Sequence, residues 1–153
     1  GYVAAFAAGG LDAVALAETT GPRGLIYRKT ADAQPYFDAA GHGLFPAFHV
    51  VAGLAAAAGS KQVAATSGDP AAVVALAHRV RGGTVLWLAN LTARRQDVKV
   101  TGLAGSPTCR VLDERTFVQA TRDARFFAAG GQPLARSGAV VLGAYAVARI
   151  RPS

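Results

Sequence analysis

The pattern of apolar residues changes near Gly59, and this change constrains the fold more than any other feature of the sequence. Before Gly59, an all-apolar run and a helical pattern alternate with loops, as in α/β units. After it, short β-rich runs are separated by Gly, Pro, Ser and Asn at intervals typical of β-sandwiches. We therefore predict two domains, residues 1–59 and residues 60–153, with the boundary between Ala57 and Ser60.

The first domain is expected to contain one strand and one helix joined by a long loop. The run Ala13–Ala17 is apolar at every position, which predicts a strand over residues 11–17 that is covered on both faces. Residues 23–43 show no sustained period and indicate a long ordered loop with one short strand at Leu25–Tyr27. Pro46 is expected to open a nearly buried helix that closes at the domain boundary.

The second domain is expected to contain at least six strands and no helix. Val98 and Val100 alternate with polar residues, so one face of their strand should be buried. The run over residues 84–89 is apolar throughout and should lie in the centre of a sheet. The predicted strands cover residues 62–66, 72–81, 84–91, 97–101, 109–112 and 139–151.

Composition favours a folded chain in a reducing compartment. Hydrophobic residues make up 52% of the sequence and charged residues 16%, which is too apolar for disorder. No apolar run reaches the roughly 20 residues that cross a bilayer, and residues 1–10 lack the features of a signal peptide. The single cysteine, Cys109, cannot form an internal disulfide and is expected to pack as a small apolar residue. We expect a cytoplasmic location, no contact with membranes and, because methionine is absent, a start inside a longer protein or after processing.

Positive charge is concentrated in the second domain. Residues 60–153 hold thirteen Lys and Arg against five Asp and Glu, which is a first indication of an anionic partner. However, the arginines are scattered between apolar residues, and only Arg94 and Arg95 are adjacent. Lysine-rich clusters and base-stacking aromatic motifs are missing. We therefore expect solvated outer faces of strands and no nucleic-acid partner.

Four segments of the sequence resemble bacterial D-apionate lactonases and, more broadly, clan-A glycoside hydrolases. Residues 11–24 resemble the last barrel strand and its loop, and Phe45–Leu54 resembles the last barrel helix. Residues 86–92 and 142–150 resemble the attached sandwich. The resemblance implies a mixed α and β chain, in which a C-terminal fragment of a (β/α)8-barrel, one βα unit, precedes an antiparallel all-β sandwich domain.

The resemblance also implies a function. Family members carry their catalytic carboxylates at the ends of the fourth and seventh barrel strands, which would precede residue 1, and glycoside hydrolysis needs two facing carboxyl groups. We therefore expect no catalytic residue, cofactor or metal in this chain, and no activity of the chain alone. The expected role is that of a non-catalytic C-terminal region of a carbohydrate-active hydrolase. The intact protein would act on a sugar-acid lactone or a glycoside, and the sandwich would stabilise the barrel.

Glu18, Thr19 and Arg23 are the candidate substrate-binding residues. Glu18 follows the apolar run at the position where barrel enzymes place their sites, with Thr19 next to it. Arg23 is suited to hold a carboxylate or sugar hydroxyls. The competing interpretations are an ordinary salt bridge for Glu18 and a solvated loop position for Arg23.

The histidines and the remaining polar motifs favour structural roles. The three histidines have no acidic partners at metal-ligand spacing. We expect His42 in a loop, and His49 in the helix, either buried or at an interface, with its hydrogen bonds satisfied. His78 is expected at the surface or facing a neighbouring strand. Trp87 is expected in the sandwich core and not on a sugar-binding surface. The glycosylation sequon that begins at Asn90 is attributed to a turn.

Two other functions stay open. The sandwich could be a carbohydrate-binding or protein-interaction module, which a row of exposed aromatic side chains would favour. The chain could also be an independent small enzyme that uses Glu18 and His42. We further expect the chain on its own to form a homodimer or larger assembly through Tyr2–Ala57, because an apolar strand and helix without the rest of their barrel leave apolar surface open.

Overall fold

The computed structural model describes residues 3–4, 15–21, 24–29, 31, 37 and 41–153. Strands predominate over helices, and the chain divides into two compact units. The sandwich unit comprises residues 1–11, 59–114 and 130–153, and the mixed unit comprises residues 12–58 and 115–129. No helix in the described ranges is both long enough and apolar enough to cross a bilayer.

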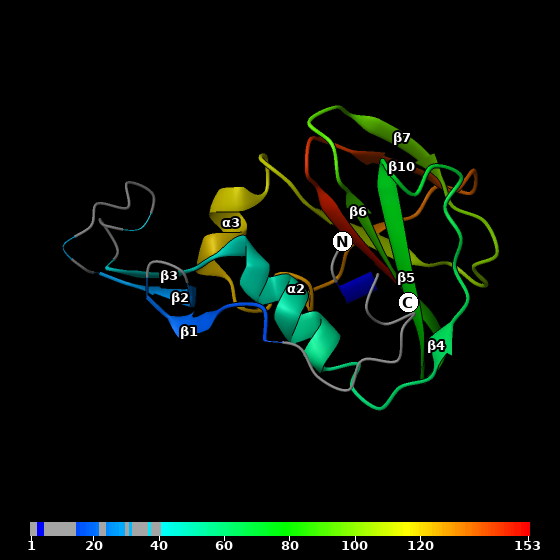
Figure 1. Ribbon diagram of the computed structural model, residues 1–153. Helices are drawn as coiled ribbons and strands as arrows, with labels where there is room; N and C mark the ends of the chain where they lie inside the picture. Colours follow the sequence, from blue (N-terminus) through cyan, green and yellow to red (C-terminus); the bar gives the residue numbers. More distant parts are fainter. Residues whose placement is uncertain (1–2, 5–14, 22–23, 30, 32–36, 38–40) are drawn as a thin grey trace. The chain divides into compact units, whose positions relative to one another are not determined.

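The sandwich unit is built from two antiparallel sheets (Figure 1). The larger sheet has the strand order β4-β5-β6-β11-β8-β9, and the smaller has the order β10-β7. An antiparallel sandwich is thus present, as the sequence predicted. The strands are β4 (Gln62–Val63), β5 (Val73–Val80), β6 (Gly83–Asn90), β7 (Gln96–Lys99), β8 (Thr108–Leu112), β9 (Gln132–Pro133), β10 (Ala139–Leu142) and β11 (Val147–Arg151).

One hydrophobic core joins the two sheets. Leu88 on β6 and Ile150 on β11 come from the larger sheet, Leu142 on β10 comes from the smaller, and all three are buried. Val98 and Val100 pack against the same core, which confirms the buried face predicted for their segment. β6 lies between β5 and β11, so the central position predicted for the all-apolar run is also confirmed.

The single strand predicted over residues 139–151 is wrong, because the structure has two strands there. β10 pairs with β7 in the smaller sheet, whereas β11 pairs with β6 and β8 in the larger. Between them the chain turns, with Tyr145 in a left-handed conformation at φ 53°. The apolar sequence suits burial in either sheet, so it does not show where the chain changes from one sheet to the other.

The mixed unit contains the sheet β1-β2-β3, formed by Glu18–Thr20, Gly24–Arg28 and His42–Leu44. β1 and β2 are parallel, β2 and β3 are antiparallel, and β2 covers the short strand predicted near residue 25. Residues 11–14 of the predicted first strand lie outside the described residues, and Ala15–Ala17 are exposed and precede β1. An apolar run forms a two-sided strand only where other elements cover it, and the described pairing starts at Glu18.

Among the described residues of the mixed unit, two segments are helical (Figure 1). α2 (Pro46–Ala55) begins at the predicted proline. α3 (Phe117–Arg122) was not predicted, since the second half of the chain was expected to be free of helix. A helix of 6 residues without a side-chain N-cap does not persist alone in water. Packing therefore holds α3, and its residues Ala120 and Thr121 are buried.

Aromatic side chains form the core of the mixed unit. Phe37 lies with its ring centroid 5.0 Å from the rings of both Tyr27 and Phe45. Phe126 is fully buried, at 0% exposure, and its ring centroid lies 5.1 Å from that of Phe127. The core thus combines residues before the predicted domain boundary with residues from the 115–129 segment, far along the chain.

Candidate functional site

Glu18 and Thr19 lie side by side in β1, and both are exposed. Arg23 lies outside the described residues. The prediction placed Glu18 after a strand, whereas the structure places it at the first position of one, where it pairs with Gly24. Successive strand residues point to opposite faces, so Glu18 and Thr19 present their side chains on different sides of β1. Both remain accessible to a ligand.

Glu18 and His42, the pair that an independent small enzyme would use, lie at opposite ends of the sheet in the mixed unit. Glu18 pairs with Gly24 at the start of β2, and His42 pairs with Arg28 at its end. The four residue steps from Gly24 to Arg28 span roughly 13 Å, so the two side chains do not share a proton. His42 also lies in β3 and not in the predicted loop.

His49 and His78 are both buried, at 3% and 7% exposure. The Nε2 atom of His49 lies 2.7 Å from the backbone oxygen of Ala120, which confirms the prediction of a hydrogen-bonded helix histidine. His78 faces Val85 on the neighbouring strand, so the cross-strand interpretation is right and the surface one is wrong. Burial and then the positive charge of Arg149 lower the pKa of His78. Across the described ranges, no three His, Cys, Asp or Glu residues gather in a possible metal site.

Trp87 is buried, at 5% exposure, and belongs to the sandwich unit as predicted. It pairs with Arg149 across β6 and β11, and the guanidinium carbon of Arg149 lies 5.4 Å from its ring centroid. Burial lowers the pKa of Arg149. Tyr145 is exposed, at 67%, and in the described part of the chain it is the one aromatic side chain among the exposed large hydrophobic residues. A row of sugar-binding rings is therefore not seen there.

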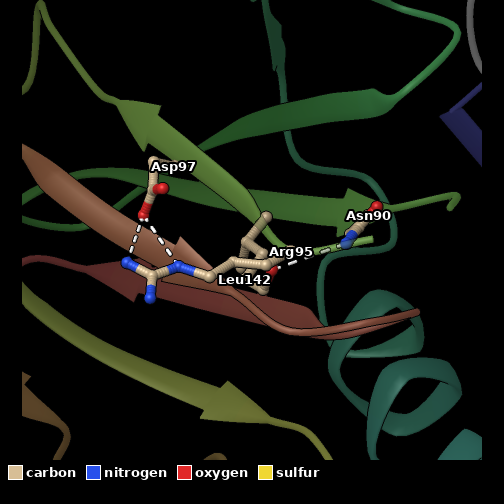
Figure 2. A network of polar contacts seen from close by, with 4 residues as sticks. All are labelled: Asn90, Arg95, Asp97 and Leu142. Carbon is tan, nitrogen blue, oxygen red and sulfur yellow. Dashed lines mark hydrogen bonds and ion pairs between the residues drawn. The ribbon is translucent and has the colours of Figure 1, made fainter. Parts of the chain in front are cut away.

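Asn90 is the centre of a buried polar network in the sandwich unit. Its Nδ2 atom donates hydrogen bonds to the backbone oxygens of Arg94 and Gly143, both at 2.7 Å. It also donates to the backbone oxygen of Leu142 at 3.5 Å, as Figure 2 shows. Its Oδ1 atom accepts from the backbone nitrogen of Thr92 at 2.9 Å. Asn90 is only 3% exposed, so its amide is not an accessible acceptor for a sugar. The predicted strand-to-turn setting of Asn90 is confirmed, since Asn90 ends β6, but its backbone belongs to the strand and it is the side chain that bonds to the following turn.

Sequence reasoning missed the role of Arg94 in this network. The backbone oxygen of Arg94 accepts hydrogen bonds from Asn90 and also from the hydroxyl of Thr92, the latter at 3.1 Å. The spacing Asn90-x-Thr92-x-Arg94 was visible in the sequence. However, Asn and Thr near a turn most often bond to their immediate neighbours, so the spacing alone did not identify Arg94.

Cys109 is expected to react slowly with alkylating agents in the folded chain. Burial raises the pKa of its thiol from 9.0 to about 11. At pH 8 the reactive thiolate should therefore be about 100-fold scarcer than in the unfolded chain. Because the folded pKa lies above the unfolded one, the stabilising contribution of the neutral thiol is complete below about pH 9 and is lost as the pH rises toward 11.

The measurement is the rate of iodoacetamide labelling, followed by mass spectrometry in native buffer and in guanidinium chloride. A native rate at pH 8 that equals the denatured rate would contradict burial of the thiol. Urea unfolding at several pH values between 8 and 11 provides the independent check on stability.

Comparison with protein families shows what the chain is similar to. Residues 1–59 match the family described as D-apionate lactonase, TIM barrel domain. Residues 70–150, more than half of the chain, match the family described as D-apionate lactonase, C-terminal immunoglobulin-like domain. No curated protein and no solved structure matches the chain. The two matches follow one another in the order that the sequence predicted, and the chain belongs to the D-apionate lactonase family.

Proposed function

We propose that this chain is the non-catalytic C-terminal region of a hydrolase that acts on a sugar-acid lactone or a glycoside. A complete (β/α)8 barrel takes about 250 residues, whereas the match to the barrel domain covers residues 1–59. Fifty-nine residues cannot supply eight βα units. In this proposal, residues 1–59 contribute the last βα unit of the barrel, and the catalytic carboxylates lie on strands that other residues supply.

We further propose that the C-terminal region stabilises the barrel. The main support comes from the position of residues 115–129. The segment lies inside the match to the immunoglobulin-like domain, yet it belongs to the same compact unit as residues 12–58. There Ala120 accepts the hydrogen bond of His49, and Phe126 packs with its ring centroid 5.5 Å from the imidazole. A domain that was only tethered to the barrel would not complete its core.

Glu18 and Thr19 are proposed to contact substrate in the complete enzyme, since both are exposed on β1. Arg23 is proposed for the same role from its place in the sequence. Self-association of the isolated chain through residues 2–57 stays a prediction, which light scattering at micromolar concentration tests.

The isolated chain is expected to show no turnover of D-apionolactone or of aryl glycosides, because paired carboxyl groups are needed for the glycosidase reaction and the match covers only part of a barrel. The test compares the isolated chain with the same chain joined to the missing barrel strands of a family member. Turnover is expected in the joined protein alone. Turnover by the isolated chain that disappears with Glu18→Gln would overturn the proposal.

A further inference from the structure

An open pocket of about 510 Å³ lies in the sandwich unit, beside the end of β6 and the start of β7. Its polar lining consists of Asp69, Thr92, Arg94, Arg95 and Gln96. Its volume falls within the range of small-ligand sites. The lining comes from two loops, and these are joined by a hydrogen bond of 2.8 Å from the backbone nitrogen of Leu91 to the backbone oxygen of Ala72.

The hydrogen bonds around Asn90 hold the backbone of Arg94 in place. Arg94 accepts hydrogen bonds through its backbone oxygen from Asn90 and Thr92, and its backbone nitrogen donates to the Thr92 hydroxyl at 3.3 Å. Thr92 is held in turn, since its hydroxyl donates to Asn90 Oδ1 at 2.8 Å. A polar group on a fixed backbone loses less conformational freedom when a ligand binds. Hydrogen bonds from the buried Asn90 and the half-buried Thr92 therefore support an exposed arginine.

The two adjacent arginines of the pocket differ in what their side chains contact. Arg95 donates from Nε and Nη2 to one oxygen of Asp97, at 3.1 and 2.7 Å (Figure 2). Arg94 is exposed, and no hydrogen bond or ion pair of its guanidinium is found among the described residues. A guanidinium offers a fork of donors that matches a carboxylate in two parallel hydrogen bonds. Arg94 is therefore the group available for an anionic ligand.

The other polar side chains of the pocket suit hydroxyl groups. Oδ1 of Asp69 accepts from the backbone nitrogens of Ala71 and Ala72, at 3.1 and 3.2 Å, which orients the carboxylate. Gln96 donates from Nε2 to the Thr92 hydroxyl at 3.1 Å, which orients its amide. The second carboxylate oxygen of Asp69 and the single amide oxygen of Gln96 remain as acceptors for ligand hydroxyls. Nearby, Tyr145 donates from its backbone to the oxygen of Thr92 at 3.0 Å.

We propose that this pocket binds a small hydroxylated carboxylate, with the ligand carboxylate on Arg94 and ligand hydroxyls on Asp69 and Gln96. Asn90 and Thr92 act as positioning residues that hold the Arg94 peptide. This binding site goes beyond the stabilising role proposed for the C-terminal region. Binding and turnover are measured in separate experiments, so one proposal can fail while the other stands.

The test is a titration of the full, ¹⁵N-labelled chain with D-gluconate, followed by amide chemical shifts. Saturable shifts are expected at Thr92, Arg94, Gln96 and Ala71–Ala72, with a dissociation constant in the millimolar range that is typical of an open polar site. Sorbitol lacks the carboxylate and acetate lacks the hydroxyls, so each is expected to bind at least about ten-fold more weakly. Arg94→Gln is expected to weaken gluconate binding by about ten-fold or more. The matched control Arg136→Gln, also at an exposed arginine of the sandwich unit, should leave it unchanged.

Three outcomes would overturn the proposal. The first is gluconate binding that Arg94→Gln does not change. The second is equal binding of gluconate and inorganic phosphate, which would show a site for any anion. The third is equal binding of gluconate and sorbitol. The positioning role has its own test, since Thr92→Val should weaken gluconate binding while Thr92→Ser, which keeps the hydroxyl, should restore it. Equal binding by these two variants would remove that role.

Discussion

Replacing Phe126 with alanine is expected to destabilise the mixed unit by about 3–5 kcal/mol, the usual cost of deleting a fully buried phenylalanine side chain. Phe126 is 0% exposed, and its ring lies against those of Phe127 and His49. The substitution leaves a cavity at the point where the 115–129 segment packs against α2. The His49 hydrogen bond to Ala120, which joins the same two segments, should then open more often.

The measurement is urea unfolding together with amide hydrogen exchange of the mixed unit. Val118→Ala is the matched control, because Val118 lies on α3 but is 50% exposed, and surface substitutions usually change stability by less than about 0.5 kcal/mol. If Phe126→Ala lowers the free energy of unfolding by less than about 1 kcal/mol, the 115–129 segment does not complete this core. That result would also remove the main support for a stabilising role of the C-terminal region.

Gly138→Ala is expected to destabilise the sandwich unit by more than about 3 kcal/mol, a loss reserved for substitutions with a specific structural cause. Gly138 has φ 72°, a left-handed conformation that costs other residues about 1–2 kcal/mol. In addition, a β-carbon at Gly138 would run into the backbone oxygen of Val100. Relief of this clash would break the hydrogen bond of 2.8 Å from the nitrogen of Val100 to the oxygen of Gly138, beside the pairing of β7 and β10.

Gly102→Ala provides the control, because Gly102 has a similar φ of 80° and no described atom near the position of its β-carbon. Gly102→Ala should lower the free energy of unfolding only by the cost of a left-handed alanine, about 1–2 kcal/mol. Fluorescence of the single tryptophan, Trp87, reports urea unfolding of the sandwich unit in both variants. If Gly138→Ala and Gly102→Ala lower the free energy of unfolding equally, the contact between Gly138 and Val100 does not restrict the substitution.

Local sequence features were sufficient to predict the elements whose own residues favour the structure that they adopt. The all-apolar run over residues 84–89 predicted a central strand, and the run forms most of β6. Pro46 predicted the start of α2, because a proline at the first position of a helix loses no hydrogen bond. The Asn90 triplet predicted a turn, and a turn follows directly after Asn90 ends β6. In each case the local preference and the final surroundings agree.

Tertiary structure decided the features that depend on distant partners. The sequence of residues 139–151 suits either sheet, and the pairing of β10 with β7 and of β11 with β6 divides it. α3 is too short to form from its own propensity, so its existence depends on packing in the mixed unit.

The same division holds for the candidate sites. Glu18, Thr19 and Arg23 could be named from the sequence because a carboxylate after an apolar run marks a strand end. Glu18, however, begins β1, because strand pairing and not apolar character alone sets the limits of a strand. The sequence showed Arg94 and Arg95 as equivalent neighbours. In the structure Asp97 binds the guanidinium of Arg95, and the buried amide of Asn90 holds the backbone oxygen of Arg94. The same amide also donates to the backbone oxygens of Leu142 and Gly143, 52 and 53 residues away, and these bonds exist only after the distant segments have met.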